Sequence, residues 1–210
     1  MAHSHAHQTD NYTLETARFN AGRNTLVFAA LVSVIASAAG YAMDADRFFE
    51  SYLVAFAFTT AIGLGAFFFV QVQYLTGSAW SVGMRRVMEN VMTTLPVGLV
   101  LFLPLLLGLN HLYPWTNPTF MASSDALKAK AGYLTQDGFV TRSVVYFVLW
   151  SLWALMIYRN SIKQDTERSA QRMHAITKWS APGLFMAVVV GSLASFDWLM
   201  SLLPGWYSTI

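Results

Sequence analysis

Four ionisable side chains stand at the ends of long apolar stretches, where they could exchange protons or bind a polar ligand. Glu50 precedes one stretch, and His111 ends another in the segment LPLLLGLNHLYPW. Arg142 lies near the start of a third stretch, and Asp197 lies near the end of a fourth in SFDWLM. Ionisable groups at such positions are costly in a membrane, so each of the four is a functional candidate by default.

These groups suit proton transfer if they pair. The pattern allows His111 to pair with Asp197, and Arg142 to pair with either Glu50 or Asp197. A carboxylate beside an imidazole is a proton acceptor and relay, because a neighbouring charge changes the proton affinity of each group. In the alternative interpretation each side chain only reaches the lipid headgroups, and Tyr113 beside His111 belongs to the aromatic belt. The apolar run continues past Asp197, which favours a functional role for that residue.

Aromatic side chains follow Arg142 along the same predicted helix. Tyr146, Trp150 and Trp153 come at successive spacings of four, four and three residues, so they share one helical face with Arg142. Such a face is suited to a flat, amphipathic ring such as a quinone head. Packing inside a helix bundle is the alternative, and it is the more common cause of an aromatic stripe.

A second polar group lies between two other apolar stretches. The segment RRVMEN contains Arg85 and Glu89, and the stretch before it ends with Gln71 and Gln73. Together these residues could begin a proton half-channel. The stronger interpretation of RRVMEN is an interfacial turn whose arginines follow the positive-inside rule.

Long apolar stretches must position all of these residues. The chain has 210 residues, of which 55% are hydrophobic and 11% charged, against roughly 25% charged in soluble domains. A helix needs about 20 apolar residues to cross roughly 30 Å of hydrocarbon. The sequence therefore predicts an all-α integral membrane protein with about five transmembrane helices. The expected spans are 26–43, 52–74, 94–109, 139–158 and 182–203.

Loop charges indicate the orientation of the chain. A cytoplasmic N-terminus places nine basic residues on the inner side and four on the outer side, in line with the positive-inside rule. The inner set is Arg18, Arg23, Arg85, Arg86, Arg159, Lys163, Arg168, Arg172 and Lys178, and the outer set is Arg47, Lys128, Lys130 and Arg142. All four ionisable groups at the span ends then lie at the outer, periplasmic face.

The start of the chain, residues 1–24, is predicted to be a polar cytoplasmic tail ahead of a helical domain over residues 25–210. No apolar segment of a signal peptide follows MAHSHAH. His3, His5 and His7 either form a metal-binding tract or, as we prefer, belong to a disordered tail. The sequence stops at GWYSTI after the fifth span, and we interpret this end as a break in a longer chain.

Composition also limits the cofactors of the chain. There is no cysteine, which excludes disulfides, covalent c-type haem and Cys-ligated iron–sulfur clusters in this chain. A membrane haem with two imidazole ligands is not expected, because His111 is the only histidine suited to that role. We predict no metal site here.

Four segments resemble one known family. FFESYLVAF, QYLTGSAWSVGMRRVMENVMTTLPV, FLPLLLGLNHLYPW and SFDWLMSLLPGWYSTI are similar to the F subunit (ActF) of bacterial alternative complex III. That family belongs with the NrfD/PsrC-like membrane subunits, and the complex is a quinol:cytochrome c (or other periplasmic acceptor) oxidoreductase. The resemblance extends over most of the chain from about Arg47.

The resemblance implies about ten helices built around two four-helix bundles. Spans two to five would form the first bundle, and the second half would follow Ile210. It also implies partner subunits that carry c-type haems and iron–sulfur clusters, and a sister NrfD-like subunit, ActC. The sister subunit is the better candidate for the productive quinol site, whereas ActF-like chains are proposed to offer a proton path.

These observations predict a membrane subunit of a respiratory quinol oxidoreductase in the bacterial inner membrane, surrounded by lipids and without a nucleic-acid partner. Quinol or quinone is the only small molecule expected. The outer-face candidates for quinol binding or proton transfer are His111, Asp197, Arg142, Tyr146 and Glu50. The inner-face candidates for a proton path are Glu89, Arg85 and Gln71. The alternatives are a non-catalytic scaffold that docks the redox subunits and a proton-translocating half-channel.

Overall fold

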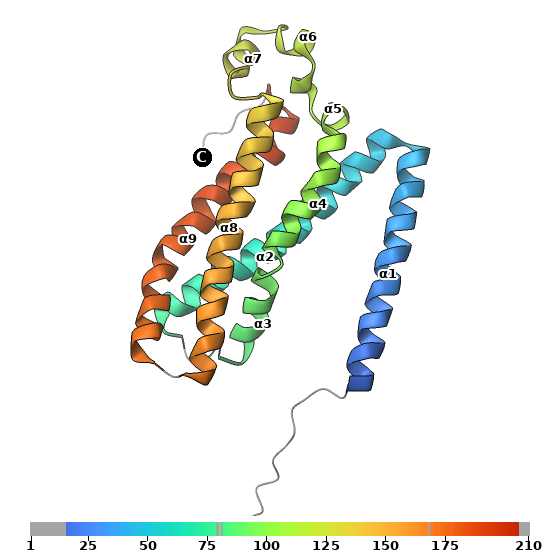
Figure 1. Ribbon diagram of the computed structural model, residues 1–210. Coiled ribbons are helices and arrows are strands. Elements are labelled where there is room, and N and C mark those ends of the chain that lie inside the picture. Colours follow the sequence, from blue (N-terminus) through green and yellow to red (C-terminus); the bar gives the residue numbers. More distant parts are fainter. Residues whose placement is uncertain (1–15, 79, 81, 168, 206–210) are drawn as a thin grey trace, which may run out of the picture. The chain divides into compact units, whose positions relative to one another are not determined.

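The computed structural model describes residues 16–78, 80, 82–167 and 169–205, so His3, His5 and His7 lie outside the described residues. Every regular element in these ranges is helical (Figure 1). Five helices are long and apolar enough to cross a membrane, which confirms the predicted class of an all-α membrane protein. They are Phe19–Met43, Ala45–Thr76, Gly83–Leu107, Gln136–Asp165 and Ala170–Leu202.

The chain divides into two compact units, Met1–Ala45 and Asp46–Ile210. In the first unit, helix α1 extends over Thr16–Met43. It begins well before the predicted span, so residues 16–24 of the predicted polar tail are helical. This segment contains no proline, and its alanine and arginine residues favour a helix even where the side chains are polar.

The second unit contains four long helical segments and a group of short helices. Helix α2 extends over Ala45–Thr76 and α8 over Gln136–Thr166, followed by α9 over Ala170–Trp198. The short helices α5, α6 and α7 lie between the third and fourth spans. Helix α5 extends over Leu109–Leu112, α6 over Pro118–Met121 and α7 over Asp125–Lys130. Two 3₁₀ turns, η1 and η2, extend over Pro114–Thr116 and Met200–Leu202.

The third span is a broken helix. It consists of α3, Val82–Met92, and α4, Leu95–Leu107, so the segment predicted to be an interfacial turn is helical. At the break, the hydroxyls of Thr93 and Thr94 donate to the carbonyls of Asn90 and Val91, at 2.7 Å each. Pro96 follows in the first turn of α4, where a missing N–H is tolerated, and because it has no N–H to donate back toward the end of α3 it favours the break between the two helices.

Aromatic side chains join the four spans of the second unit into one core. The ring of Phe56 on α2 lies 5.8 Å from Phe102 on α4, 6.0 Å from Phe147 on α8 and 5.1 Å from Trp198 on α9, between ring centroids. These distances are typical of favourable aromatic pairs. The second to fifth spans therefore pack around shared side chains as a four-helix bundle.

Glycines let these helices approach each other closely. A Cβ atom added to Gly98 on α4 would lie 2.4 Å from Cε1 of Phe147 on α8. A Cβ atom added to Gly183 on α9 would lie 2.5 Å from Nε1 of Trp153 and 2.9 Å from the amide of Gln71. Small residues at such contacts are typical of helix packing in membranes, where van der Waals contact is a main driving force.

The short helices cover one end of the bundle, beside the start of α8 and the end of α9 (Figure 1). Lys130 at the end of α7 donates its ammonium proton to the carbonyl of Pro204, at 2.7 Å. The hydroxyl of Tyr113 donates to the carbonyl of Trp198, at 3.1 Å. These bonds attach the loop between the third and fourth spans to the last turn of the fifth.

Candidate functional site

Asp197 is the centre of a polar cluster at this end of the bundle. It lies in the last turn of α9, and its side chain is fully buried. Arg142 donates to both carboxylate oxygens, from Nε to Oδ2 and from Nη2 to Oδ1, at 2.9 Å each. Tyr146 donates its hydroxyl to Oδ2 at 2.7 Å. A bidentate, charge-assisted pair of this kind is among the stronger polar contacts in proteins.

Helix geometry explains why these groups meet. Arg142 and Tyr146 are four residues apart on α8, so their side chains lie on the same helical face and reach Asp197 on the adjacent α9 together. The guanidinium of Arg142 also donates from Nη1 to the carbonyl of Tyr133, at 3.1 Å. Its central carbon lies 3.8 Å from the centre of the Tyr133 ring, within the range of a cation–π contact.

Burial differs between the two charged partners. The side chain of Asp197 has no exposed surface, whereas 24% of the Arg142 side chain is exposed. The carboxylate is therefore dry, and it faces the outside of the protein through a guanidinium that has two further partners. This arrangement keeps a negative charge inside the bundle without leaving it uncompensated.

Neighbouring hydrogen bonds hold the end of α9 in place. Trp198 donates from Nε1 to the hydroxyl oxygen of Ser143 at 2.9 Å, and Ser201 donates its hydroxyl to the carbonyl of Asp197. Burial raises the pKa of the Tyr113 phenol, and the negative charge of Asp197 adds to the effect. Burial, followed by the charge of Asp197, also raises the pKa of Tyr133, so both phenols keep their protons to a higher pH than a free tyrosine does.

His111 does not join this cluster, although the sequence allowed it to pair with Asp197. Its Nδ1 atom lies 2.5 Å from Oδ1 of Asp46, and its ring stacks on Phe49 with centroids 5.3 Å apart. The reason is the close contact of the α4–α5 junction with α2, where a Cβ atom on Gly108 would lie 2.2 Å from the Phe49 ring. The His111 and Asp46 side chains are 41% and 74% exposed, so they form a surface pair.

The remaining outer-face candidates have different surroundings. Glu50 is exposed on α2, and Arg142 takes Asp197 as its partner, which selects one of the two pairings that the sequence allowed. Trp150 is fully buried between the helices, and its ring lies 6.1 Å from Tyr146. Trp150 thus packs inside the bundle, as in the alternative to a ring-binding face, whereas Trp153 is half-buried and donates from Nε1 to the carbonyl of Trp179 at 3.0 Å.

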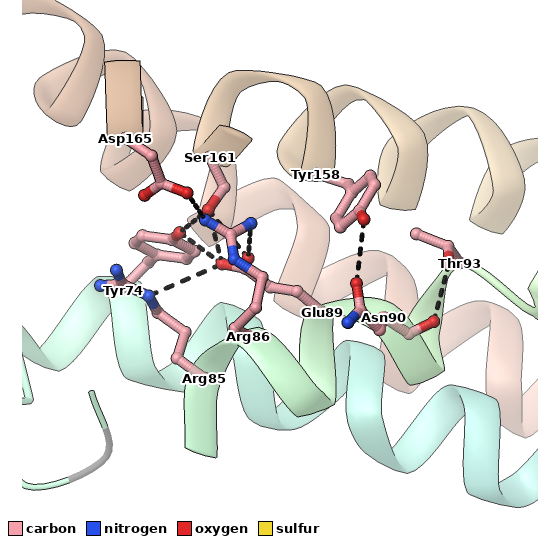
Figure 2. A network of polar contacts seen from close by, with 9 residues as sticks. All are labelled: Tyr74, Arg85, Arg86, Glu89, Asn90, Thr93, Tyr158, Ser161 and Asp165. Carbon is pink, nitrogen blue, oxygen red and sulfur yellow. Dashed lines mark hydrogen bonds and ion pairs between the residues drawn. The ribbon is translucent and has the colours of Figure 1, made fainter. Parts of the chain in front are cut away.

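A second buried carboxylate, Glu89 on α3, lies in the network shown in Figure 2. Its Oε1 atom accepts the hydroxyl of Tyr74 at 2.6 Å, and the hydroxyl oxygen of Ser161 lies 2.8 Å from both carboxylate oxygens. Arg86 donates from Nη1 to Oε2 at 2.6 Å, and Nε of Arg85 lies 3.7 Å from Oε1. Three spans therefore contribute to one carboxylate site.

Arg86 connects this buried site with the surface, because its other terminal nitrogen bonds to the exposed Asp165 (Figure 2). The interpretation of RRVMEN as a simple interfacial turn does not account for this arrangement. The second arginine of the segment is committed to a carboxylate that has no exposed surface. Sequence reasoning missed Tyr74 and Ser161, and the only signal for them was their polar character inside apolar stretches.

Gln71 lies one helical turn before Tyr74 on α2. Its side chain is fully buried, and neither amide atom has a hydrogen-bond partner within the described part of the chain. The amide packs against the backbone of Gly183. An unpaired amide in the interior is costly, so this position is one where a water molecule or a change of rotamer would be favourable.

The two carboxylate sites lie toward opposite ends of the bundle. Arg142 and Ser161 mark them on α8, and the 19 residues between these positions correspond to about 28 Å of helix. The aromatic core of Phe56, Phe147 and Trp198 lies between them, and the rings of the last two stack at 5.4 Å. Among the described residues, Glu89 and Asp197 are therefore two separate buried acids at different levels of the bundle.

Comparisons with known proteins do not assign this arrangement to a family. No known family model matches the chain, and no match was found among curated proteins. In the described ranges, no group of three or more His, Asp or Glu side chains is arranged to hold a metal ion.

Proposed function

We propose that this chain is a membrane subunit of a respiratory quinol:cytochrome c (or other periplasmic acceptor) oxidoreductase, in which Asp197 transfers protons at the periplasmic face. The resemblance of four sequence segments to ActF supports the assignment to such a complex. The observation that carries the proton-transfer role is the fully buried Asp197 carboxylate, which is paired with the partly exposed side chain of Arg142.

Proton transfer at Asp197 requires that its ion pair can open. Arg142 has two other partners, the carbonyl and the ring of Tyr133, which hold the guanidinium when it leaves the carboxylate. Tyr146 keeps its hydrogen bond to Oδ2 and orients the carboxylate. The freed Oδ1 atom then accepts a proton released by quinol oxidation, and the return of Arg142 favours release of that proton toward the periplasm.

Electron transfer belongs to partner subunits in this proposal. Quinol oxidation releases two electrons and two protons, and this chain contains no cysteine to hold a c-type haem or an iron–sulfur cluster. The partners are subunits that carry c-type haem and iron–sulfur clusters, together with a sister NrfD-like subunit. The excess of basic residues in one set of loops supports a cytoplasmic N-terminus in a bacterial inner membrane.

Glu89 supports a second candidate function, a proton half-channel on the cytoplasmic side. A fully buried carboxylate joined to the surface through Arg86 suits proton entry. Gln71 is buried one turn from Tyr74 and has no hydrogen-bond partner in the described part of the chain, so it would bind a water molecule there. The aromatic core between Glu89 and Asp197 then separates uptake on one side from release on the other.

A scaffold without chemistry is the competing function, and the complete pairing of both carboxylates favours it. Buried ion pairs of this kind also occur where they only fix one packing arrangement. In that case the chain docks the redox subunits, and neither acid changes protonation during turnover.

The test compares Asp197→Asn with Asp46→Asn in the intact complex, because Asp46 is an exposed acid at the same end of the bundle. Loss of a proton-transferring group typically slows a reaction by about 100-fold or more. For Asp197→Asn we expect a loss of about 100-fold or more in quinol turnover and proton release, with normal assembly. For Asp46→Asn and His111→Ala we expect near-normal rates. Normal turnover in an assembled Asp197→Asn complex would refute the role, and failure of that variant to assemble would favour the scaffold.

A further inference from the structure

A small cavity lies beside the break between α3 and α4. Its volume is about 40 Å³, and it is lined by residues of α2, the helix break, α4 and α8. Among them are Thr59, Thr60, Gly63, Thr94 and Phe147. Most of the lining is apolar, but three threonine side chains contribute hydroxyl groups.

Thr60 is the unusual member of this lining. Its side chain is 6% exposed, and its hydroxyl has no hydrogen-bond partner among the residues that the structure describes. Threonines in helices commonly donate to the carbonyl four residues earlier, as Thr59 does to Ala55 at 2.8 Å. A buried hydroxyl without a partner is costly, and it requires either an explanation or a ligand.

We infer that the cavity binds a water molecule that bridges α2 to the helix break. The volume is sufficient, since one buried water needs roughly 10–15 Å³. Thr60 has a free hydroxyl hydrogen to donate to this water. The water can donate in turn to the hydroxyl oxygen of Thr94, because the hydrogen of that hydroxyl is directed to the carbonyl of Val91 and its lone pairs are available.

Water fits this cavity better than a cation or an acyl chain does. The lining contains no carboxylate, so a cation would be buried without a counter-charge. An acyl chain would leave the Thr60 hydroxyl unpaired. Helix packing at Gly63 and Gly98 also fixes the size of the space, because a Cβ atom on Gly98 would collide with the Phe147 ring.

This water site is independent of the proposed function. It accounts for how a helix break that contains two threonines and a proline is tolerated inside a membrane span, where polar groups at a break are satisfied by side chains or by ordered water. The water would attach the end of α3 and the start of α4 to α2 at a single point.

High-resolution structures of the full chain in lipid nanodiscs would test the inference, with Thr60→Val as the variant and Thr59→Val as the matched control. We expect a density peak within hydrogen-bond distance of the Thr60 and Thr94 hydroxyls. The peak should be absent in Thr60→Val and present in Thr59→Val. The inference is overturned if the wild-type map resolves other buried waters but shows this cavity empty, or filled by acyl-chain density.

Thermal unfolding gives a second readout with opposite signs for the two cases. A hydrated Thr60 contributes a water-bridged hydrogen bond, so Thr60→Val should lower Tm. Thr60→Ser keeps the hydroxyl and should lower Tm much less. If the cavity is dry, valine removes an unpaired hydroxyl and Tm should rise, which would also overturn the inference.

Discussion

Arg142→Leu should destabilise the chain more than Asp197→Asn does, because the two substitutions leave different groups behind. With leucine at position 142, the Asp197 carboxylate remains fully buried with no counter-charge. Its remaining side-chain partners are then phenol hydroxyls, among them that of Tyr146. With asparagine at position 197, the amide oxygen still accepts hydrogen bonds, and the partly exposed Arg142 side chain can reach water.

The magnitudes follow from these environments. Removal of one partner of a buried ion pair costs about 3–5 kcal/mol, and the 24% exposure of the Arg142 side chain places Arg142→Leu near the lower value, about 3 kcal/mol. Asp197→Asn should cost about 1–2 kcal/mol, as expected for weakened hydrogen bonds at a buried site. The double variant should lose less free energy of unfolding than the two single variants lose together, by at least about 1 kcal/mol, because Arg142 and Asp197 contact each other.

Equilibrium unfolding in mixed micelles measures these differences. Lys128→Leu is the matched control, since Lys128 forms an exposed pair with Asp125 at the same end of the chain. The control should change the free energy of unfolding by less than about 0.5 kcal/mol. Equal losses for Arg142→Leu and Asp197→Asn, or strict additivity in the double variant, would refute the assignment of a dry, paired carboxylate.

Three further predictions concern packing, the inner site and alkaline pH. Gly98→Ala should lower the free energy of unfolding by about 1–3 kcal/mol, because the new Cβ atom would overpack against Phe147. Gly191→Ala is the control and should not lower it, because no atom lies within 4 Å of its new Cβ atom. Equal unfolding midpoints for the two variants would contradict this. Glu89→Leu should destabilise by about 2 kcal/mol by leaving the Ser161 hydroxyl and the Arg86 guanidinium without the buried carboxylate that both contact, and Glu89→Gln by roughly half of that, with thermal unfolding as the measurement and equal losses as the contrary result. Because burial raises the pKa of Tyr113, the folded chain retains a proton that the unfolded chain loses above about pH 10. Stability should therefore fall as pH rises through that range, and the fall should be shallower in Tyr113→Phe; identical slopes would count against it.

Apolar runs made the class of fold predictable. Each of the five spans expected from run length overlaps a helix that is long enough to cross a membrane, although spans 94–109 and 182–203 extend slightly past the ends of theirs, at Leu107 and Leu202, and the helices extend beyond the apolar runs at several other ends. Run length detects the lipid-facing and core residues but not the polar turns that continue the same helix. This is why the helix around Glu89 was interpreted as an interfacial turn, since the Glu89 carboxylate is satisfied by Tyr74 and Ser161 from distant parts of the chain.

The candidate site was predictable only as a set of possible partners. Arg142, Tyr146 and Asp197 were all identified, and the spacing of four on one helix predicted that the first two act together. The sequence did not distinguish Glu50 from Asp197 as the partner of Arg142, because that choice depends on which helices are adjacent. The pairing of His111 with Asp46 depends on the contact of Gly108 with Phe49, which no local pattern indicates.

Membership in a quinol-oxidising complex is tested most directly by purifying the full-length protein with its native partners in mild detergent and assaying quinol-dependent reduction of cytochrome c. The proposal predicts that c-type haem and non-haem iron copurify with this chain in fixed ratio, and that the preparation transfers electrons from quinol to the acceptor. Purification of a stable assembly that contains neither haem nor iron and shows no quinol-dependent activity would contradict it.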